Sequence, residues 1–285
     1  MINFKAYMTS IYETEKQAMA LHQPASPNLM TQLVRASLGS DGLSESEIYG
    51  NLFVFSFAGH DTTANTLTIS FFLLASSPQI QTWIAEELNA VLGDNPPSSW
   101  NYTTSFPHLK RTLALLYETI RLYTPVPIAK STGNGAQSVT VEGKEILIPG
   151  DVLIIPHYTA VHTQPKVWGP DSLSWKPSRW IKTDSKYPDN IEHEQFLTAQ
   201  KGTFIPWSEG VRNCPGKKFS QVEFVAVIAT ILKDWYVEPK CFGNESLEEA
   251  RRRVVRFVEE DTGLVLLLQI LHPESTPLVW KRRHT

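Results

Sequence analysis

The amino-acid sequence predicts a mainly α-helical protein with a minor β-sheet, an α+β fold, for three reasons. Long apolar stretches begin at helix-capping residues, such as Ser44 followed by Glu47. The middle of the chain changes from helical spacing to short alternating runs, which are typical of strands. No internal repeat, low-complexity tract or clean linker divides the 285 residues. We therefore expect one helix-dominated unit with a sizeable core.

Proline and glycine mark where the predicted helices begin and end. Pro24 and Pro27 divide the first helical region, Pro78 opens a helix capped by Ser77, and Gly93 ends it. The predicted helices cover two stretches within residues 1–37, followed by 44–75, 78–93, 108–123 and 215–233. Loops are expected at 38–43 and 94–106, and residues 163–213 are irregular and rich in Pro, Trp and Gly.

The predicted strands lie in the middle and at the C-terminal end. A small β-meander is indicated by alternating apolar residues at Val139, Val141, Ile146, Ile148, Val152 and Ile154. Gly143 and the pair Pro149-Gly150 separate these runs. Short strands are also expected within 264–271 and 278–281.

Composition excludes several classes of protein. The net charge of −3 provides no field that would gather nucleic acid. The two cysteines, Cys214 and Cys241, are too few for a disulfide scaffold and indicate reduced thiols in a cytosol-facing compartment. No signal peptide is apparent. Residues 52–75 have a suitable length for a bilayer, but a charge such as Asp61 at the centre costs roughly 3 kcal/mol. This segment is therefore predicted to be a helix buried in protein, and no membrane anchor is expected.

The surroundings of Cys214 favour an anionic sulfur. We expect the thiol at the N-terminus of a helix, where backbone N–H groups stabilise a thiolate, with Arg212 two residues away. Gly210 permits a tight turn, and Gly216 lets the backbone approach a flat ligand. A zinc site would need three or four protein ligands, which are not present here. A metal that takes a single protein thiolate is one already held by a macrocycle, as in haem. The alternative is a buried structural thiol.

This loop resembles the haem-binding signature of the cytochrome P450 superfamily, in which an aromatic, Gly, Arg, Cys and Gly recur at fixed spacing. Trp207, Gly210, Arg212, Cys214 and Gly216 occupy those places, with Trp207 where Phe is usual. The resemblance implies that Cys214 is the axial ligand of the iron of haem b and that Arg212 pairs with a haem propionate. Trp207 is expected to stack near the sulfur and tune its electron donation.

A polar patch interrupts the long apolar helix. Small Ala58 and Gly59 would let the helix lie against a porphyrin, and the Thr62 hydroxyl and Asp61 carboxylate suit proton handling. The patch resembles the family's oxygen-activation motif, which implies that Thr62 hydrogen-bonds dioxygen and that Asp61 relays protons. His60 fills the variable place and is expected to hydrogen-bond locally. The alternative is a self-satisfied polar cluster or a kink at Gly59.

Glu118 and Arg121 are three residues apart in an apolar helical stretch, so they share a face and are expected to be buried. Together with Arg179 they resemble the family's Glu-x-x-Arg helix and Pro-x-Arg segment. The resemblance gives them a structural role, which is to hold the irregular segment that leads to the cysteine loop. An ordinary surface ion pair is the alternative.

The three motifs occur in the family's order, and the resemblance implies that residues 1–285 are the C-terminal part of a single catalytic domain whose N-terminal half is missing. It implies a monooxygenase that inserts one atom of O2 into an apolar substrate, with electrons from NADPH through a cytochrome P450 reductase-type partner. For the full-length family member it implies the endoplasmic reticulum membrane. Substrate-lining segments are expected at 53–62, 124–130 and within 261–271.

Two other classes remain open at this point. One is a truncated, catalytically inactive P450-like fragment with weak or no haem binding. The other is a helical interaction protein in which Cys214 is simply a thiol.

Overall fold

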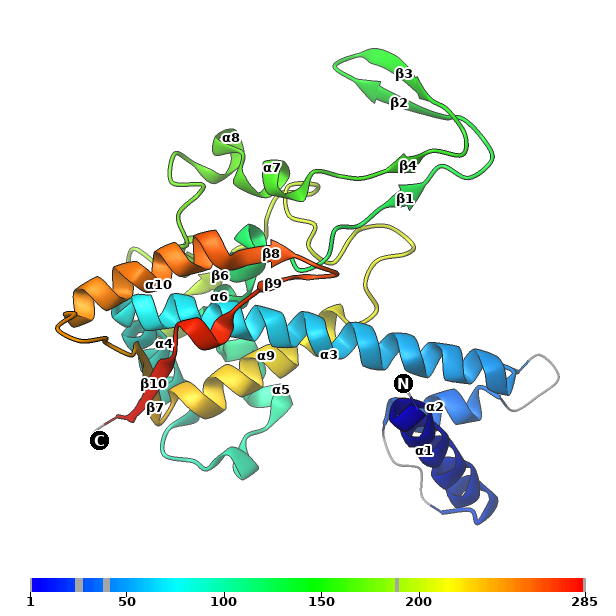
Figure 1. The fold of residues 1–285 in the computed structure, drawn as a ribbon, viewed down its shortest axis with the longest axis horizontal. Coiled ribbons are helices and arrows are strands. Elements are labelled where there is room, and N and C mark those ends of the chain that lie inside the picture. The colour runs from blue at the N-terminus through cyan, green and yellow to red at the C-terminus, as the bar shows by residue number, and fades with distance from the viewer. Residues whose placement is uncertain (1, 24–27, 38–41, 188–189, 284–285) are drawn as a thin grey trace. The chain divides into compact units, whose positions relative to one another are not determined.

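The computed structural model describes residues 2–23, 28–37, 42–187 and 190–283. The chain forms two compact units, Met1–Asp61 and Thr62–Thr285. The elements are coloured along the chain in Figure 1. Helices dominate and the strands form small antiparallel ladders, so the predicted mainly α, α+β class is confirmed. That the whole chain is part of one catalytic domain remains a prediction.

The first unit consists of α1 (Ile2–Ala20), α2 (Leu29–Arg35) and the beginning of α3 (Glu45–Ser76). Its core consists of Met8, Tyr12, Leu33, Val34, Ile48 and Leu52. The predicted capping box is present, because Ser44 N donates to Glu47 Oε2 at 2.8 Å and Glu47 N donates to Ser44 Oγ at 3.3 Å. Pro24, Pro27 and most of the predicted loop at 38–43 lie outside the described residues.

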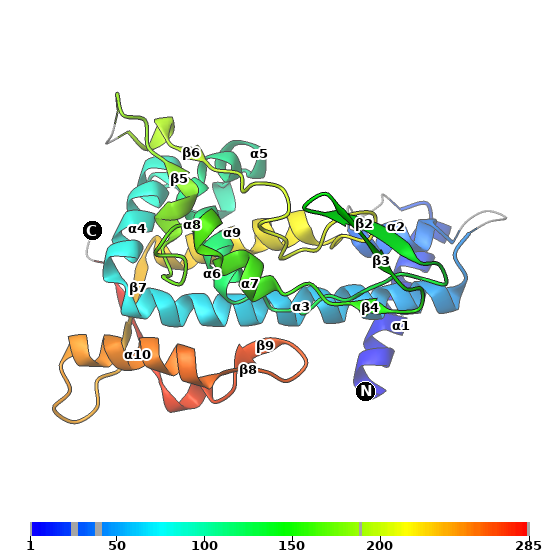
Figure 2. The ribbon, with the colours of Figure 1, turned by 90° about the horizontal axis from the view of Figure 1, so that it is seen from above.

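The second unit is built around α4 (Pro78–Leu92), α6 (Lys110–Leu122) and α9 (Lys217–Leu232), which pack with the end of α3. Figure 2 shows α9 running alongside α6 in this unit. The buried side chains of α9 recur at helical spacing and are Gln221, Phe224, Val225, Ile228, Ala229 and Leu232. Glu87, on α4, caps the start of α6, where its carboxylate accepts hydrogen bonds from Arg111 N at 2.5 Å and Thr112 N at 2.9 Å.

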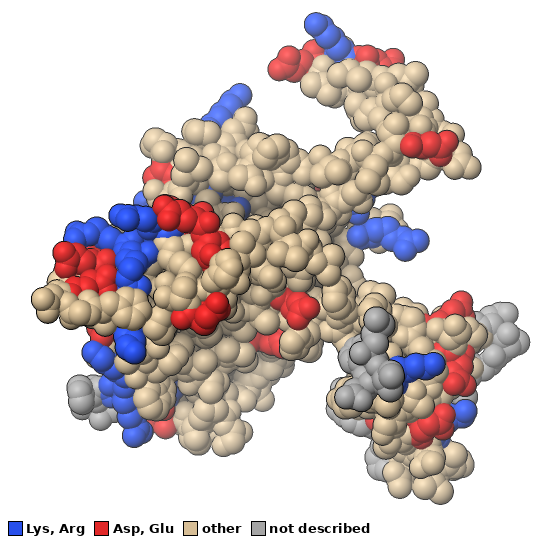
Figure 3. Space-filling view, in the orientation of Figure 1, with Lys and Arg blue, Asp and Glu red and all other residues tan. Residues whose placement is uncertain are grey.

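The expected strands within 264–271 and 278–281 are present, but a helix that was not predicted also follows α9. Helix α10 (Leu247–Asp261) occupies this region and begins at a capping box formed by Ser246 and Glu249. Its buried residues Ala250, Val254 and Val258 are four apart, and the last two pack with Ile69, Phe72 and Leu73 of α3. The opposite face is covered by acidic and basic side chains (Figure 3). The helix is therefore amphipathic, with its apolar side against α3.

The predicted β-meander is replaced by two separate ladders. Strands β2 (Gln137–Val141) and β3 (Lys144–Ile148) form a hairpin, but β4 (Leu153–Ile154) pairs with β1 (Lys130–Ser131) instead of extending it. Glu142 and Gly143 both have positive φ, which a two-residue hairpin turn of the I′ type requires. Figure 1 shows the hairpin beyond the β1–β4 ladder.

Strands β7 (Trp235–Pro239) and β10 (Leu278–Arg282) form a further antiparallel ladder. The Gln81 side chain bonds to Val237 on β7 at both backbone groups. Its Oε1 accepts from Val237 N and its Nε2 donates to Val237 O, each at 2.8 Å.

The remaining elements are short. They are α5 (Tyr102–Ser105), α7 (Tyr158–Thr163), α8 (Pro165–Trp168), β5 (Ile181–Lys182), β6 (Gln195–Phe196), β8 (Thr262–Leu264) and β9 (Leu268–Ile270). Single 3-10 turns occur at Pro97–Ser99, Phe106–His108, Pro177–Trp180, Ile191–His193 and Pro273–Ser275. Among the described residues, no helix combines the length and the hydrophobicity needed to cross a membrane.

Candidate functional site

The cysteine loop, residues 204–216, is closed by backbone hydrogen bonds. Cys214 N donates to Trp207 O at 2.8 Å, and within the loop Asn213 N donates to Gly210 O at 3.1 Å. Gly210 has φ +85°, a left-handed conformation in which a side chain would be strained. Ser208 also has positive φ, +62°. The loop thus folds back on itself and presents Cys214 at its end.

The surroundings of Cys214 are open enough for a flat ligand. The thiol is free and exposed, and no atom would lie within 4 Å of a Cβ added to Gly210. A Cβ on Gly216 would lie 3.8 Å from Cys214 Sγ, at ordinary van der Waals distance, so Gly216 lies directly beside the sulfur. Val211 in the loop is fully exposed and Phe219 in the first turn of α9 is 67% exposed, so both contribute apolar surface near Cys214 in the sequence. A single exposed thiol with apolar, glycine-lined space beside it fits an apolar macrocycle.

The position of Cys214 differs from the predicted one in one respect. Helix α9 begins at Lys217 with Gly216 as its N-cap, so Pro215 is not the first helical residue. Cys214 therefore lies before the helix and not at its first turn. Because the field of a helix N-terminus falls off within a turn, it favours the thiolate less than the sequence suggested.

The Trp207 side chain is directed into the protein. Its ring packs on Tyr117 at 5.3 Å between centroids, and its Nε1 donates to Ser220 Oγ at 3.1 Å. The hydrogen bond between Cys214 and Trp207 joins the Cys214 N–H to the Trp207 backbone carbonyl. It does not involve the indole ring. Arg212 is exposed, its carbonyl accepts from Lys130 Nζ at 3.3 Å, and within the described part of the chain it forms no ion pair with a protein carboxylate.

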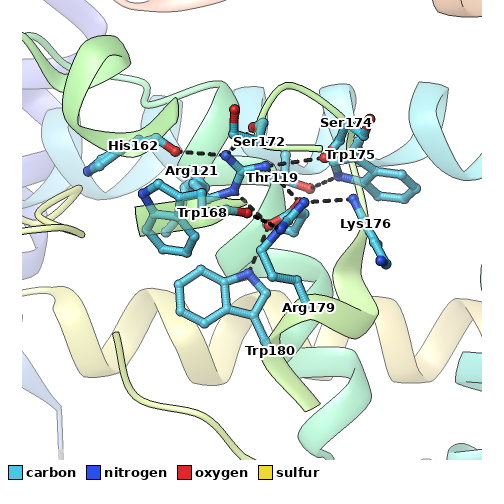
Figure 4. Close-up of polar contacts among 12 residues, drawn as sticks. Thr119, Arg121, His162, Trp168, Ser172, Ser174, Trp175, Lys176, Arg179 and Trp180 are labelled. Carbon is cyan, nitrogen blue, oxygen red and sulfur yellow. Dashed lines mark hydrogen bonds and ion pairs between the residues drawn. The ribbon is translucent and has the colours of Figure 1, made fainter. Parts of the chain in front are cut away.

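Glu118, Arg121 and Arg179 come together in one polar cluster, and Figure 4 shows Arg121 and Arg179 within it. Glu118 and Arg121 have no exposed side-chain surface, so they do not form a surface pair. Arg121 binds Glu118 through Nε to Oε2 and Nη2 to Oε1, each at 2.8 Å. Arg179 Nε lies 3.3 Å from Glu118 Oε1, and Trp180 Nε1 donates to Oε2 at 2.9 Å.

Arg121 also ties α6 to backbone far along the chain. Its Nη1 donates to the carbonyls of His162 at 2.7 Å and Ser172 at 2.6 Å, and its Nη2 donates to that of Ser174 at 3.2 Å. With the two bonds to Glu118, all five N–H donors of the guanidinium have acceptors. The pair therefore fixes the path of the irregular segment 162–180 against α6.

Asp171 is a member of this cluster that sequence reasoning missed. Its Oδ1 accepts from Arg179 Nη1 at 3.0 Å and its Oδ2 from Lys176 Nζ at 3.1 Å. These hydrogen bonds, first that of Arg179 and then that of Lys176, lower the pKa of the Asp171 carboxyl to about 2. The proximity of Asp171 to the Pro-x-Arg segment could have indicated such a partner.

His162 was also missed, because a lone histidine in an irregular segment carries no signal of its own. It is fully buried at the end of α7. Its Nε2 accepts from Ile205 N at 2.9 Å, and its Nδ1 lies 3.2 Å from Thr124 Oγ1. Burial lowers the pKa of its imidazole to about 4, and the nearby Arg121 charge acts in the same direction.

The predicted oxygen-activation residues lie on α3. Ala58, Gly59 and Asp61 belong to the first unit, whereas Thr62 and the cysteine loop belong to the second. His60 Nδ1 lies 2.8 Å from Asp61 Oδ1, the local hydrogen bond expected of His60. Thr62 is half-buried, and its carbonyl accepts from Thr66 Oγ1 at 2.8 Å. An open surface hollow of about 350 Å³ is lined by one face of the helix, namely Phe53, Ser56, Phe57, His60 and Asp61.

No group of three or more His, Cys, Asp or Glu side chains within the described residues is arranged to hold a metal ion. Cys214 therefore belongs to no such group among the described residues. This donor set, one thiolate, suits an iron whose other ligands come from a porphyrin.

The family model of cytochrome P450 matches residues 2–257. The chain belongs to the cytochrome P450 family. Its curated relatives include a phomenoic acid biosynthesis cluster cytochrome P450 monooxygenase of Leptosphaeria maculans, 33% identical over 77% of this chain and 40% of that protein. Cytochrome P450 monooxygenase prx9 of Penicillium rubens is 30% identical over 81% of this chain and 44% of that protein.

A plant relative, 7-deoxyloganic acid hydroxylase of Catharanthus roseus, is 33% identical over 70% of this chain and 35% of that protein. The chain therefore spans about two fifths of the length of these curated P450 relatives. A crystal structure of a cytochrome P450 superposes with a TM-score of 0.71 and 19% identity, covering 98% of this chain and 56% of the solved one. The P450 fold expected from the sequence is confirmed.

Proposed function

We propose that this chain carries the thiolate-ligand part of a haem-dependent monooxygenase, with Cys214 as the axial ligand of the iron. The observation that carries the proposal is the free, exposed Cys214 at the end of a closed loop with open space beside Gly210. Arg212, exposed and without a protein carboxylate partner in the described chain, is suited to a haem propionate. Haem, when bound, supplies the activation of O2.

The chain's own residues would hold the sulfur and manage protons. The Cys214 thiolate would hold the iron and supply electron density to it. The Cys214 N–H is engaged by the Trp207 carbonyl, which holds the thiolate residue in place. On α3, the Thr62 hydroxyl would donate a hydrogen bond to dioxygen, and Asp61, whose Oδ1 lies 2.8 Å from His60 Nδ1, would relay protons from solvent.

The substrate is proposed to be an apolar small molecule. Phe53 and Phe57 stack at 5.8 Å between ring centroids and line the hollow on α3 together with Asp61. This surface is largely aromatic, which favours an apolar ligand over a charged one. Two electrons per turnover are proposed to come from NADPH through a cytochrome P450 reductase-type partner at the endoplasmic reticulum membrane.

The test of the ligand assignment is Cys214→His in the full-length protein, with Cys241→Ser as the matched control. Both cysteines are free and exposed, so the pair controls for thiol chemistry in general. Wild type and Cys241→Ser are expected to show the red-shifted ferrous–CO absorption band of a thiolate-ligated haem. Cys214→His is expected to lose it. A band that survives Cys214→His rules out the assignment.

A second candidate is that residues 1–285 alone do not turn over a substrate. Large apolar side chains are exposed on α3 and on the hairpin, including Phe53, Val54, Val141 and Leu147. Each such side chain left in water forgoes roughly 1.5–3 kcal/mol of burial. We expect the isolated chain to show low solubility and weak haem retention. A soluble monomer with full haem occupancy and reductase-dependent hydroxylation would contradict this.

A further inference from the structure

His162 connects three segments of the second unit that are far apart in the sequence. The backbone carbonyl of His162 accepts a hydrogen bond from Arg121 Nη1 on α6 at 2.7 Å. Its ring reaches Thr124, just after α6, on one side and Ile205, at the start of the cysteine loop, on the other. The ring has no solvent-exposed surface.

The hydrogen bonds of the ring define one tautomer. The Thr124 hydroxyl has a single hydrogen, which it donates to the Ile120 carbonyl at 2.8 Å, so toward His162 it is an acceptor. His162 Nδ1 must then carry the proton. Nε2 is left as the acceptor for the Ile205 N–H at 2.9 Å. Both ring nitrogens are satisfied only when the imidazole is neutral and protonated on Nδ1.

If Nε2 were protonated, its N–H would face the Ile205 N–H, and two donors would then point at each other without an acceptor. A backbone hydrogen bond to Arg121 favours a cation, but burial outweighs it and no charged side chain around the ring in the described chain supports it. Arg121 on α6 is itself positive, and Tyr158 on α7, with its ring 5.9 Å away, is neutral. The loop segment opposite is Phe204, Ile205 and Pro206, which carries no titratable group. The lowered pKa of the imidazole agrees with this arrangement.

The contact with Ile205 leads to the thiol by a short route. Two residues further on, the Trp207 carbonyl accepts the Cys214 N–H at 2.8 Å. The Ser208 N–H donates to the Ile205 carbonyl at 3.0 Å, so the other backbone group of Ile205 begins the turn of the loop. Phe204 packs on the His162 ring at 5.3 Å between centroids. The buried Glu118–Arg121 pair and the cysteine loop are therefore linked through His162.

We infer that His162 is a positioning residue for Cys214, which anchors the beginning of the cysteine loop by accepting the Ile205 N–H. The inference rests on the proposed role of Cys214 as the haem ligand. It adds a residue outside the signature, 52 positions before the cysteine, whose neutral ring sets the path of the loop.

The test compares His162→Leu, which removes the acceptor, with His162→Gln, whose side-chain oxygen can take the place of Nε2. Hydrogen exchange of the Ile205 amide and alkylation of Cys214 are measured on the full-length protein without haem. Cys241 is the internal control for alkylation, because it is equally free but not in this loop. Loss of a hydrogen bond worth roughly 1–1.5 kcal/mol is about a tenfold change in an opening equilibrium.

We expect Ile205 exchange to rise about tenfold in His162→Leu and to return toward wild type in His162→Gln. The Cys214 alkylation rate should likewise rise in His162→Leu and return toward wild type in His162→Gln. The alkylation rate of Cys241 should stay constant in both variants. Unchanged Ile205 exchange in His162→Leu overturns the inference. If that variant does not fold, the Ile205 amide resonance of His162→Gln decides. The resonance must shift when an imidazole acceptor becomes an amide, and an unshifted resonance overturns the inference as well.

The ferrous–CO band of the haem-loaded full-length protein separates this inference from the proposed function. If Cys214→His retains the red-shifted band, the ligand assignment fails whatever His162 does. If wild type shows the band, Cys214→His loses it, and His162→Leu keeps both the band and Ile205 protection, only the role of His162 fails. The expected result is a smaller fraction of the red-shifted band in His162→Leu and recovery in His162→Gln.

Discussion

Arg121 and Glu118 form a two-point ion pair from which water is excluded, with both nitrogen-to-oxygen distances at 2.8 Å. Removing two charges from water is costly, and their attraction offsets this only when the remaining donors and acceptors are satisfied. Here the Arg121 donors reach the carbonyls of His162, Ser172 and Ser174. The energetic consequence is asymmetric, since loss of either partner leaves a buried charge without compensation.

Glu118→Ala is therefore expected to destabilise the protein by roughly 3–5 kcal/mol. Urea unfolding of wild type and variant measures the difference. Glu248→Gln is the matched control, because Glu248 and Arg252 form an exposed helical pair at 3.9 Å and should cost less than about 1 kcal/mol. Similar midpoints for Glu118→Ala and Glu248→Gln would show that the buried pair contributes no more than a surface one.

Asp171 gives the folded protein a dependence on acid. Its folded-state pKa of about 2 lies below the ordinary value of 3.8, so the unfolded chain takes up the proton first as the pH falls. The stability that Asp171 contributes is complete above about pH 4 and is lost as the pH falls toward 2. The unfolding midpoint should therefore change less with pH between these values in Asp171→Asn than in wild type. An identical pH profile would show that the Arg179 and Lys176 contacts are not maintained in solution.

Glu87 should give the opposite dependence at higher pH. Burial raises the pKa of its carboxyl to about 7 from 4.5, although it accepts hydrogen bonds from Arg111 and Thr112. Between these values the unfolded chain loses the proton before the folded one does. Stability from this group therefore falls as the pH rises from about 4.5 to about 7, by on the order of 3 kcal/mol. Glu87→Gln should remove this decline. A decline that persists in the variant must come from another group.

His162 should act in the reverse direction over an overlapping range. Its folded-state pKa of about 4 lies below 6.5, so the unfolded chain binds the proton first as the pH falls. Its contribution is complete above about pH 6.5 and is lost toward pH 4. Stability measured from pH 4 to 7 should therefore rise less with pH in His162→Gln than in wild type, the reverse of Glu87→Gln. Shifts of the same sign in both variants would contradict one of the two pKa directions.

Thr62→Ala is expected to leave haem binding intact in the full-length protein but to divert reducing equivalents to peroxide. The reason is loss of the hydroxyl that we propose to direct a proton toward dioxygen on α3. Peroxide formed per NADPH consumed is the measurement, and Thr66→Val, four residues along the same helix, is the control. Coupling of electron use to product that is unchanged in Thr62→Ala would refute the proton role.

Features that depend on residues close together in the chain could be predicted from the sequence. The ends of α3 and α4 follow from Ser44 with Glu47 and from Gly93, and the cysteine loop from the spacing around Cys214. Helix α10 was missed although its capping residues, Ser246 and Glu249, are visible in the sequence. Its apolar positions are only every fourth residue and are outnumbered by charges.

Contacts between a side chain and distant backbone could not be predicted. His162 is defined by an N–H at Ile205 and a guanidinium at Arg121, 43 and 41 positions away. Every residue type except proline has a backbone N–H, so the sequence does not indicate which N–H a distant side chain will bind. Strand β7 was missed for the same reason, since its neighbour β10 begins only at Leu278.

The bonds between Gln81 and Val237 have a consequence for the edge of strand β7. An exposed strand edge offers unpaired N–H and C=O groups to which another chain can add. The N–H and C=O of Val237 point away from β10 and are both hydrogen-bonded by the Gln81 side-chain amide. Gln81 Nε2 also donates to the Leu74 carbonyl at 2.8 Å. One side chain thus imitates the next strand and closes the ladder. Replacing Gln81 with Leu would leave the N–H and C=O of the fully buried Val237 without these partners, at a cost of roughly 1–3 kcal/mol for each group.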